Sequence, residues 1–152
     1  MRFLEGNFTD PQVIALLEAH VRRARAETGR GSAHALDLSG LKTADIRFWT
    51  AWQGERLVGM GALKTLSSDH GEIKSMHTAE SARHQGIGGA VLGHIMAEAG
   101  RMGMARLSLE TGSWDYFIPA RAFYRRNGFV ECGPFGDYKP DPNSVFMTRA
   151  LP

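Results

Sequence analysis

A glycine-rich stretch from Met76 to Ala90, between a predicted strand and a predicted helix, most constrains how this chain can fold. Within it, Arg83 is followed by Gly86, Gly88 and Gly89. Glycines let a loop turn tightly and bring its N–H groups close to a ligand, because no Cβ stands in the way. The first N–H groups of a helix lack internal partners and attract anions. The stretch therefore predicts a strand–loop–helix unit that binds a phosphate or pyrophosphate, with the charge of Arg83 at its edge.

Strand and helix patterns alternate on both sides of this stretch. The strands before it are separated by short turns, which favours an antiparallel meander, and the helix after it favours a parallel strand pair with a right-handed crossover. Strands are expected at 2–5, 46–52, 57–66, 72–78, 105–110, 129–132 and 144–150, and helices at about 11–28, 87–99 and 119–126. Residues 33–44 fit either a helical turn or an irregular segment. With 152 residues and no repeat or linker, the chain is predicted to form a single mixed α/β domain, 1–152.

Composition narrows the functional classes. The net charge is +2 and the basic residues are scattered, which argues against a nucleic-acid binder. The single cysteine, Cys132, excludes an intramolecular disulfide and any multi-cysteine metal site. No apolar run approaches about 18 residues and no signal-peptide pattern is present, so we expect a cytoplasmic protein without a membrane partner.

Three kinds of glycine-rich turn compete for the stretch at 83–89. The dinucleotide fingerprint needs a third glycine where this chain has Val91. The phosphate loop of nucleotide hydrolases ends in Gly-Lys-Ser/Thr, and here Gly89 is followed by Ala90. The glycines by themselves also fit a third possibility, a turn that shapes the backbone and binds no ligand.

Two motifs together resemble a known family. Arg83-x-x-Gly86-x-Gly88 is followed downstream by Ala120-x-x-Phe123-Tyr124-x-x-x-Gly128-Phe129. This order and spacing resemble the GNAT superfamily of N-acetyltransferases. The segments 109–112 and 133–135 resemble a bacterial subgroup labelled YsnE-like. The resemblance implies a central, mostly antiparallel sheet with a splayed parallel strand pair, flanked by helices.

The resemblance also implies acetyl-CoA as cosubstrate. Its pyrophosphate is expected to bind the loop, and its pantetheine arm the backbone of Met76 and Thr78, which the splayed strands leave unpaired. The implied loop residues are Arg83, His84, Gln85, Gly86, Ile87, Gly88 and Gly89. No catalytic metal is expected.

Acetyl transfer to an amine needs a base near the amine and a proton for the leaving thiolate. Tyr124 matches the family tyrosine that can donate this proton. Glu72 is the first candidate base and Glu110 the second. Strict alternation along 72–78 predicts that Glu72 shares a face with Lys74, Met76 and Thr78, and that His77 lies on the opposite face.

One position departs from the family pattern. The family often has asparagine where this chain has Phe117, which puts one pantetheine contact in doubt. Trp114, Tyr116 and Phe117 are instead expected to cover the cofactor or to wall the acceptor site.

The acceptor is expected to enter from the side opposite CoA. In the family architecture, the segments 32–41 and 133–143 bound this entrance, and they carry His34, Asp37, Tyr138, Lys139 and Asp141. This mixed polar set favours neither a polyamine nor a peptide. The leading expectation is the primary amine of a small molecule, such as a free amino acid, acetylated by direct transfer in a ternary complex. A protein N-terminus or lysine as acceptor, and a non-catalytic acyl-CoA sensor, stay open as alternatives, as does a homodimer.

Overall fold

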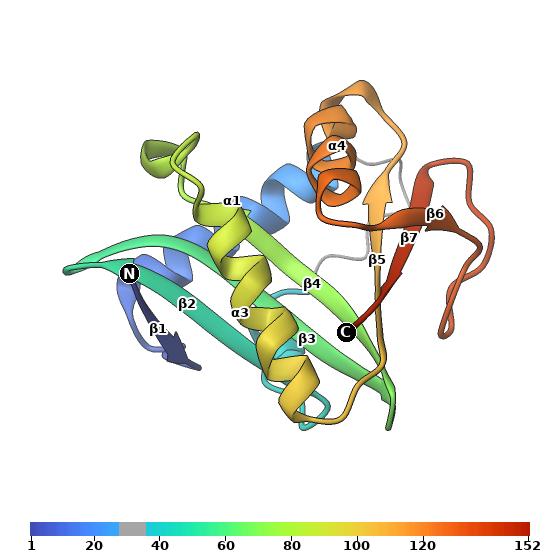
Figure 1. Ribbon diagram of the computed structural model, residues 1–152. Helices are drawn as coiled ribbons and strands as arrows, with labels where there is room; N and C mark the ends of the chain where they lie inside the picture. Colours follow the sequence, from blue (N-terminus) through green and yellow to red (C-terminus); the bar gives the residue numbers. More distant parts are fainter. Residues whose placement is uncertain (28–35) are drawn as a thin grey trace.

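The computed structural model describes residues 1–27 and 36–152, and its strands form one seven-stranded sheet in the order β1-β2-β3-β4-β5-β7-β6 (Figure 1). The strands are β1 (Arg2–Glu5), β2 (Ile46–Gln53), β3 (Arg56–Ser67), β4 (His70–Thr78), β5 (Arg106–Gly112), β6 (Val130–Cys132) and β7 (Ser144–Ala150). Only the pair β4–β5 is parallel among these strands, and the other neighbours are antiparallel. The predicted mixed α/β fold with a mostly antiparallel sheet is confirmed.

The helices also follow the sequence pattern closely. They are α1 (Pro11–Glu27), α2 (Leu38–Leu41), α3 (Ile87–Arg101) and α4 (Ile118–Arg126), with short 3-10 turns η1 (Glu80–Ala82) and η2 (Asp115–Phe117). The ambiguous segment thus contains one helical turn, α2. The expected end of the first helix near Thr28, and residues 33–35, lie outside the described residues. No helix in 1–27 or 36–152 is long and apolar enough to span a bilayer.

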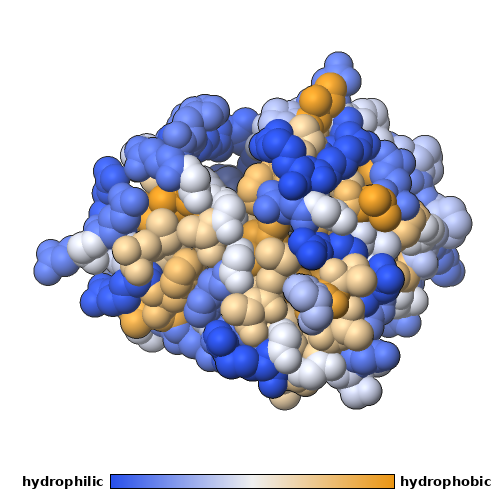
Figure 2. Space-filling view, viewed as in Figure 1, coloured by the Kyte–Doolittle hydropathy of each residue, from blue (hydrophilic) through white to orange (hydrophobic). Residues whose placement is uncertain are grey.

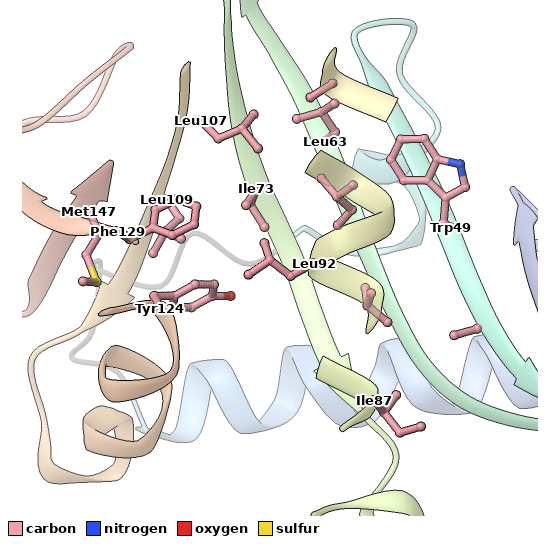
Figure 3. Packing of buried hydrophobic residues seen from close by; sticks show 14 of the residues in the cluster. Trp49, Leu63, Ile73, Ile87, Leu92, Leu107, Leu109, Tyr124, Phe129 and Met147 are labelled. Atoms are coloured by element: carbon pink, nitrogen blue, oxygen red, sulfur yellow. The ribbon is translucent and has the colours of Figure 1, made fainter. Parts of the chain in front are cut away.

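The two faces of the sheet carry separate apolar cores. In Figure 1, α3 crosses the near face of the sheet and α1 runs behind it. Val13 and Leu17 of α1 pack with Phe48, Met60 and other residues of the far face. The near-face cluster joins α3 to β3, β4, β5 and α4 (Figure 3). The residues of this second cluster labelled in Figure 3 are Trp49, Leu63, Ile73, Ile87, Leu92, Leu107, Leu109, Tyr124, Phe129 and Met147.

Glycines in β3 let α3 lie close to the sheet. A Cβ on Gly61 would stand 2.7 Å from Cδ1 of Ile95, and one on Gly59 would stand 2.8 Å from Cγ2 of Ile87. Real Cβ atoms do not approach so closely, so α3 would have to move outward if either position carried a side chain. This close packing fixes the start of α3, and with it the glycine loop, against the end of β4.

The parallel pair opens after three register positions. β4 and β5 pair only at His70–Arg106, Gly71–Leu107 and Glu72–Ser108, although β4 continues to Thr78 and β5 to Gly112. Figure 1 shows the two strands diverging from this point toward α4. The sheet therefore has a gap between the last residues of β4 and β5.

A β-bulge breaks the alternation of β4. Met60 of β3 pairs with His77, whereas Ala62 pairs with Lys74, so the single residue between them on β3 faces Ser75 and Met76 together. Because paired residues of an antiparallel ladder share a face, His77 lies on the same face as Lys74. The prediction that His77 lies opposite Glu72, and that Met76 and Thr78 share the face of Glu72, is wrong for this reason. The side chain of Met76 instead packs against the near-face cluster beside α3.

Candidate active site

A cavity of about 170 Å³ fills the gap between β4 and β5. Its walls come from β4 and β5, from Phe117 and α4 on one side, and from α1 and the start of β7 on the other. Figure 2 shows the surface hollowed between the loop before α3 and α4, on the side of the cavity where the strands diverge. Tyr124, Glu72 and Glu110, the sequence-predicted catalytic residues and alternative base, all line this cavity.

Tyr124 reaches the cavity from α4, whose second residue is a proline that suits the first turn of a helix. Its ring meets Phe123 and Phe129 edge to face, with centroids 5.2 and 5.6 Å apart. Figure 3 shows its hydroxyl directed across the gap from β5 toward β4. Burial raises the pKa of this hydroxyl above its ordinary range, so it is protonated at neutral pH. No residue of the described chain forms a hydrogen bond with it, so its proton is available to a ligand.

Glu72 lies on the opposite face and is only 2% exposed. Its Oε2 accepts a hydrogen bond of 2.5 Å from the hydroxyl of Tyr138 and one of 3.2 Å from Nζ of Lys74. Nζ of Lys74 also donates to the Tyr138 hydroxyl at 2.9 Å, which closes a triangle of three polar groups. Burial and the neighbouring carboxylate raise the pKa of Tyr138, so its hydroxyl stays a donor. The triangle holds the carboxylate at the wall of the cavity.

Glu110 lies on β5 two residues beyond the last β4–β5 pair. Its Oε2 accepts a hydrogen bond of 2.6 Å from Oγ of Ser144, at the start of β7. Glu110 pairs with Phe146, whose ring contacts Tyr138, so both carboxylates lie on the α1 side of the sheet. Tyr124 belongs to the cluster on the α3 side. The cavity therefore passes through the sheet, with a proton donor on one side and carboxylates on the other.

The glycine loop has the geometry of a helix-terminal anion site. His84 and Gly86 adopt positive φ values of 64° and 76°, and Gly86 is the N-cap of α3. The first helical bond runs from Ala90 N to Gly86 O at 3.1 Å, so the amides between them have no carbonyl inside the helix. The side chain of Ile87 is buried, so only its backbone can face a ligand. The loop is exposed at Arg83, His84, Gln85, Gly86 and Gly89.

Gly88 of this loop lies beside β4 and α4, two elements that also wall the cavity. A Cβ built on it would lie 3.5 Å from the ring of Phe123 and 3.9 Å from Oγ1 of Thr78. Thr78 ends β4 and Phe123 precedes Tyr124 on α4, so position 88 faces the space between these two elements. Beyond Glu72, no described strand pairs with the edge of β4 that faces β5. An extended ligand arm with amide groups could pair with this edge through the backbone of residues 76–78.

The predicted acceptor residues do not gather at one place. Tyr138 contacts Glu72, as described above. Asp37 caps α2 by accepting from Gly40 N at 2.9 Å, and this bond lowers the pKa of its carboxyl. Asp141 closes a turn by accepting from Asn143 N at 2.8 Å, and Lys139 is exposed. His34 lies outside the described residues.

The aromatic loop after β5 packs against that strand, and the loop as a whole does not cover the cavity. The ring of Phe117 lies so close to Gly112 that a Cβ there would stand 2.2 Å from Cε2, and Phe117 lines the cavity. Arg121 of α4 donates to the carbonyl of Gly112 at 2.7 Å. Trp114 and Tyr116 stay 42% and 41% exposed.

Two cavity residues carried no sequence signal. His20 of α1 lines the cavity and contacts His77, with ring centroids 5.1 Å apart, because the bulge turns His77 toward α1. Ser75, at the bulge itself, also lines the cavity. Across residues 1–27 and 36–152, no group of three or more His, Cys, Asp or Glu side chains is placed to hold a metal ion.

Comparisons with known proteins point to one family. The model of the acetyltransferase (GNAT) family matches residues 13–129. The uncharacterized N-acetyltransferase YsnE of Bacillus subtilis is 48% identical over 145 residues, which cover 95% of this chain and 96% of that protein. An IAA acetyltransferase of Azospirillum brasilense is 42% identical over 121 residues, 79% of this chain and 78% of that protein.

Solved structures share the fold over nearly the whole chain. A structure from Klebsiella pneumoniae, whose acyl-CoA N-acyltransferase activity is an inference, has 32% identity and a TM-score of 0.80 and covers 99% of this chain and 97% of its own. An aminoglycoside 6'-N-acetyltransferase complexed with coenzyme A has 16% identity and a TM-score of 0.73, with the same coverage.

Proposed function

This chain belongs to the acetyltransferase (GNAT) family, and we propose that it transfers an acetyl group from acetyl-CoA to the primary amine of a small molecule. The observation that carries the proposal is the gap between β4 and β5. It holds a cavity with Tyr124 on one side of the sheet and Glu72 and Glu110 on the other, and β4 runs from this cavity toward the glycine loop.

The residues along this route fit CoA. The exposed amides at the start of α3 suit a pyrophosphate, and the free edge of β4 suits the amides of a pantetheine arm. Position 88 has no side chain to block the passage between Thr78 and Phe123. Acetyl-CoA supplies the activated acetyl thioester in this proposal.

The protein groups then divide the proton transfers. Attack of a neutral amine on the thioester carbonyl forms the C–N bond, and loss of the thiolate breaks the C–S bond. Tyr124 is the proposed donor of the proton to sulfur, since its hydroxyl is protonated and has no partner in the described chain. Glu110 and the Glu72 triangle lie where the amine would lose its protons, directly or through water. No acyl-enzyme is needed.

The charge of the cavity bears on the acceptor class. Its described carboxylates are Glu72 and Glu110, and Lys74 is its basic side chain, bonded to Glu72. Two carboxylates against one lysine give this lining a net negative balance, which attracts a positively charged ammonium group that must lose a proton before it attacks. A volume of about 170 Å³ suits a small amine better than a folded protein segment.

Two measurements test this function. Acetyl-CoA at millimolar concentration is expected to raise the Tm, because a ligand that binds only the folded state stabilises it. Release of free thiol from acetyl-CoA is then followed with a panel of amino acids, small amines and an N-terminal peptide. No thermal shift contradicts cofactor binding. A thermal shift without thiol release from any amine supports the acyl-CoA sensor instead.

A further inference from the structure

Ser75 combines two unusual features at the cavity. It is the first residue of the β-bulge and has φ of 55°, a left-handed conformation in which glycine is the usual residue. The residue is 8% exposed, and its buried Oγ has no hydrogen-bond partner among the residues that the structure describes.

Both features destabilise the folded chain. A non-glycine residue at positive φ is strained, and a buried hydroxyl without a partner loses its bonds to water. A glycine at this position would remove both penalties. Residues that carry such penalties cluster at functional sites. Ser75 lines the same cavity as Tyr124 and Glu72, so a ligand in this cavity lies beside the residue.

The other hydroxyl groups that line the cavity, apart from that of Tyr124, already donate to protein acceptors. Thr111 donates to the carbonyl of Gly112 at 3.1 Å, and Ser144 donates to Glu110 at 2.6 Å. Of the hydroxyl groups among the described lining residues, only those of Ser75 and Tyr124 have no protein acceptor. Acetyl transfer from a thioester also places negative charge on two atoms, the carbonyl oxygen and then the sulfur.

We propose that Ser75 is a catalytic residue whose hydroxyl donates a hydrogen bond to the acetyl carbonyl oxygen. The inference rests on the proposed acetyl transfer. As the amine nitrogen bonds to the carbonyl carbon, the carbonyl π electrons move onto oxygen, where Ser75 stabilises the charge. Those electrons then re-form the C=O bond as the C–S bond breaks, and Tyr124 protonates the thiolate. Ser75 keeps its own proton throughout, so it acts only by hydrogen bonding.

A vibrational measurement tests the contact without any acceptor. The carbonyl stretch of acetyl-CoA labelled with ¹³C at the carbonyl is recorded by difference infrared spectroscopy on the binary complex. A hydrogen bond from Ser75 weakens the C=O bond, so the stretch is expected at lower frequency in the wild type than in Ser75→Ala. Equal frequencies in the two proteins overturn the proposal.

Turnover and stability of Ser75 variants give an independent test, because kcat is expected to fall while the Tm of the glycine variant rises. With the amine that the wild type acetylates fastest, Ser75→Ala and Ser75→Gly are expected to lower kcat by roughly 100-fold. Their thermal shift with acetyl-CoA is retained, and Ser75→Gly is expected to raise the Tm of the free protein by about 2–4 °C. A structural role predicts instead that kcat and Tm fall together.

Ser108→Ala is the matched control. Ser108 is also buried, on the neighbouring strand, but its Oγ lies 2.7 Å from Nε2 of His70 and 2.9 Å from Oγ1 of Thr148. Its loss is expected to lower the Tm and leave kcat near the wild-type value. Wild-type kcat in Ser75→Ala overturns the role of Ser75 while leaving acetyl transfer intact. Absence of both thiol release and a thermal shift in the wild type marks failure of the proposed function itself.

Discussion

The hydroxyl of Tyr138 donates a 2.5 Å hydrogen bond to Oε2 of Glu72, a residue 66 positions away in the chain. This bond ties the loop between β6 and β7 to β4 at the wall of the cavity. Lys74 bonds to both groups and completes their arrangement. A surface loop thus fixes a carboxylate that is almost fully buried.

Tyr138→Phe is expected to lower the free energy of unfolding by roughly 1–3 kcal/mol, because the buried carboxylate loses a donor that nothing replaces. Urea unfolding monitored by circular dichroism measures the change. Tyr116→Phe is the control, since Tyr116 is 41% exposed. Equal unfolding midpoints for the two variants contradict the role given to the Tyr138 bond.

Tyr124→Phe separates chemistry from binding. It is expected to lower kcat by roughly 100-fold, a size typical of general-acid catalysis, and to leave the Kd for acetyl-CoA nearly unchanged. Folding is expected to be unaffected because the hydroxyl has no protein partner in the described chain. Stopped-flow thiol release and calorimetry measure the two quantities. A parallel loss of CoA affinity identifies Tyr124 as a packing residue instead.

Gly88→Glu is expected to weaken acetyl-CoA binding at least tenfold, because it places a carboxylate in the passage between Thr78 and Phe123. The Kd from calorimetry is the measurement. Gly93→Glu makes the same substitution on the same helix, at an exposed position with open space around it. Wild-type affinity is expected there, and equal effects of the two substitutions argue against a CoA site at the start of α3.

Gly112→Ala tests how tightly the loop after β5 is pinned. Its Cβ would stand 2.2 Å from Cε2 of Phe117, so the ring must move, at a cost of roughly 1–3 kcal/mol in the free energy of unfolding. The double variant Gly112→Ala/Phe117→Ala removes the clash. In urea unfolding, the double variant is expected to lose less free energy of unfolding than the sum of the losses in the two single variants. If the losses in free energy of unfolding are simply additive, the Cβ at position 112 does not clash with the ring of Phe117.

The histidine pair predicts a pH dependence of stability. Burial is the main cause and nearby positive charge the lesser one, and together they lower the pKa of both His20 and His77 from 6.5 to about 4. Between pH 6.5 and 4 the unfolded chain therefore binds more protons than the folded chain. The free energy of unfolding falls as the pH falls through this window, by up to about 1.4 kcal/mol per pH unit for each histidine.

His77→Asn is expected to flatten this dependence. Urea midpoints at pH 7, 6 and 5 give the slope for each protein. His84→Asn is the control because His84 is exposed, and its positive φ of 64° suits asparagine. A slope for His77→Asn as steep as that of the wild type would place the acid sensitivity elsewhere.

The order of the strands and helices could be predicted from the sequence because it rests on local signals. Pro11 marks the start of α1 and Gly86 the start of α3, and apolar periodicity marks their buried faces. The strand at 144–150 was predicted to the residue, and β4 begins two residues earlier than expected. The glycine loop and Tyr124 are predicted from two motifs, because the spacing of their residues can be recognised in a single sequence.

The faces of β4 could not be predicted, because the bulge has no local signal. Alternation assumes regular pairing, and neither glycine nor asparagine stands at position 75 to suggest a positive φ. That one residue moved His77 to the α1 side and Met76 to the α3 side. The bond between Tyr138 and Glu72 is likewise a product of tertiary structure, since the two residues come from distant parts of the chain.

The short β4–β5 ladder also shapes the mechanics of the sheet. Among the described strands, three register pairs of β4 and β5 join β1–β4 to β5–β7, so the ladder between these two groups is short. A ligand arm that bonds to the free edge of β4 and contacts α4 would therefore bridge the two groups of strands across the gap. Amide hydrogen exchange is then expected to slow along residues 73–78 when the ligand binds, and to slow in α4 at the same time. The missing stretch of ladder thus makes the stiffness of the whole sheet depend on what lies in the gap.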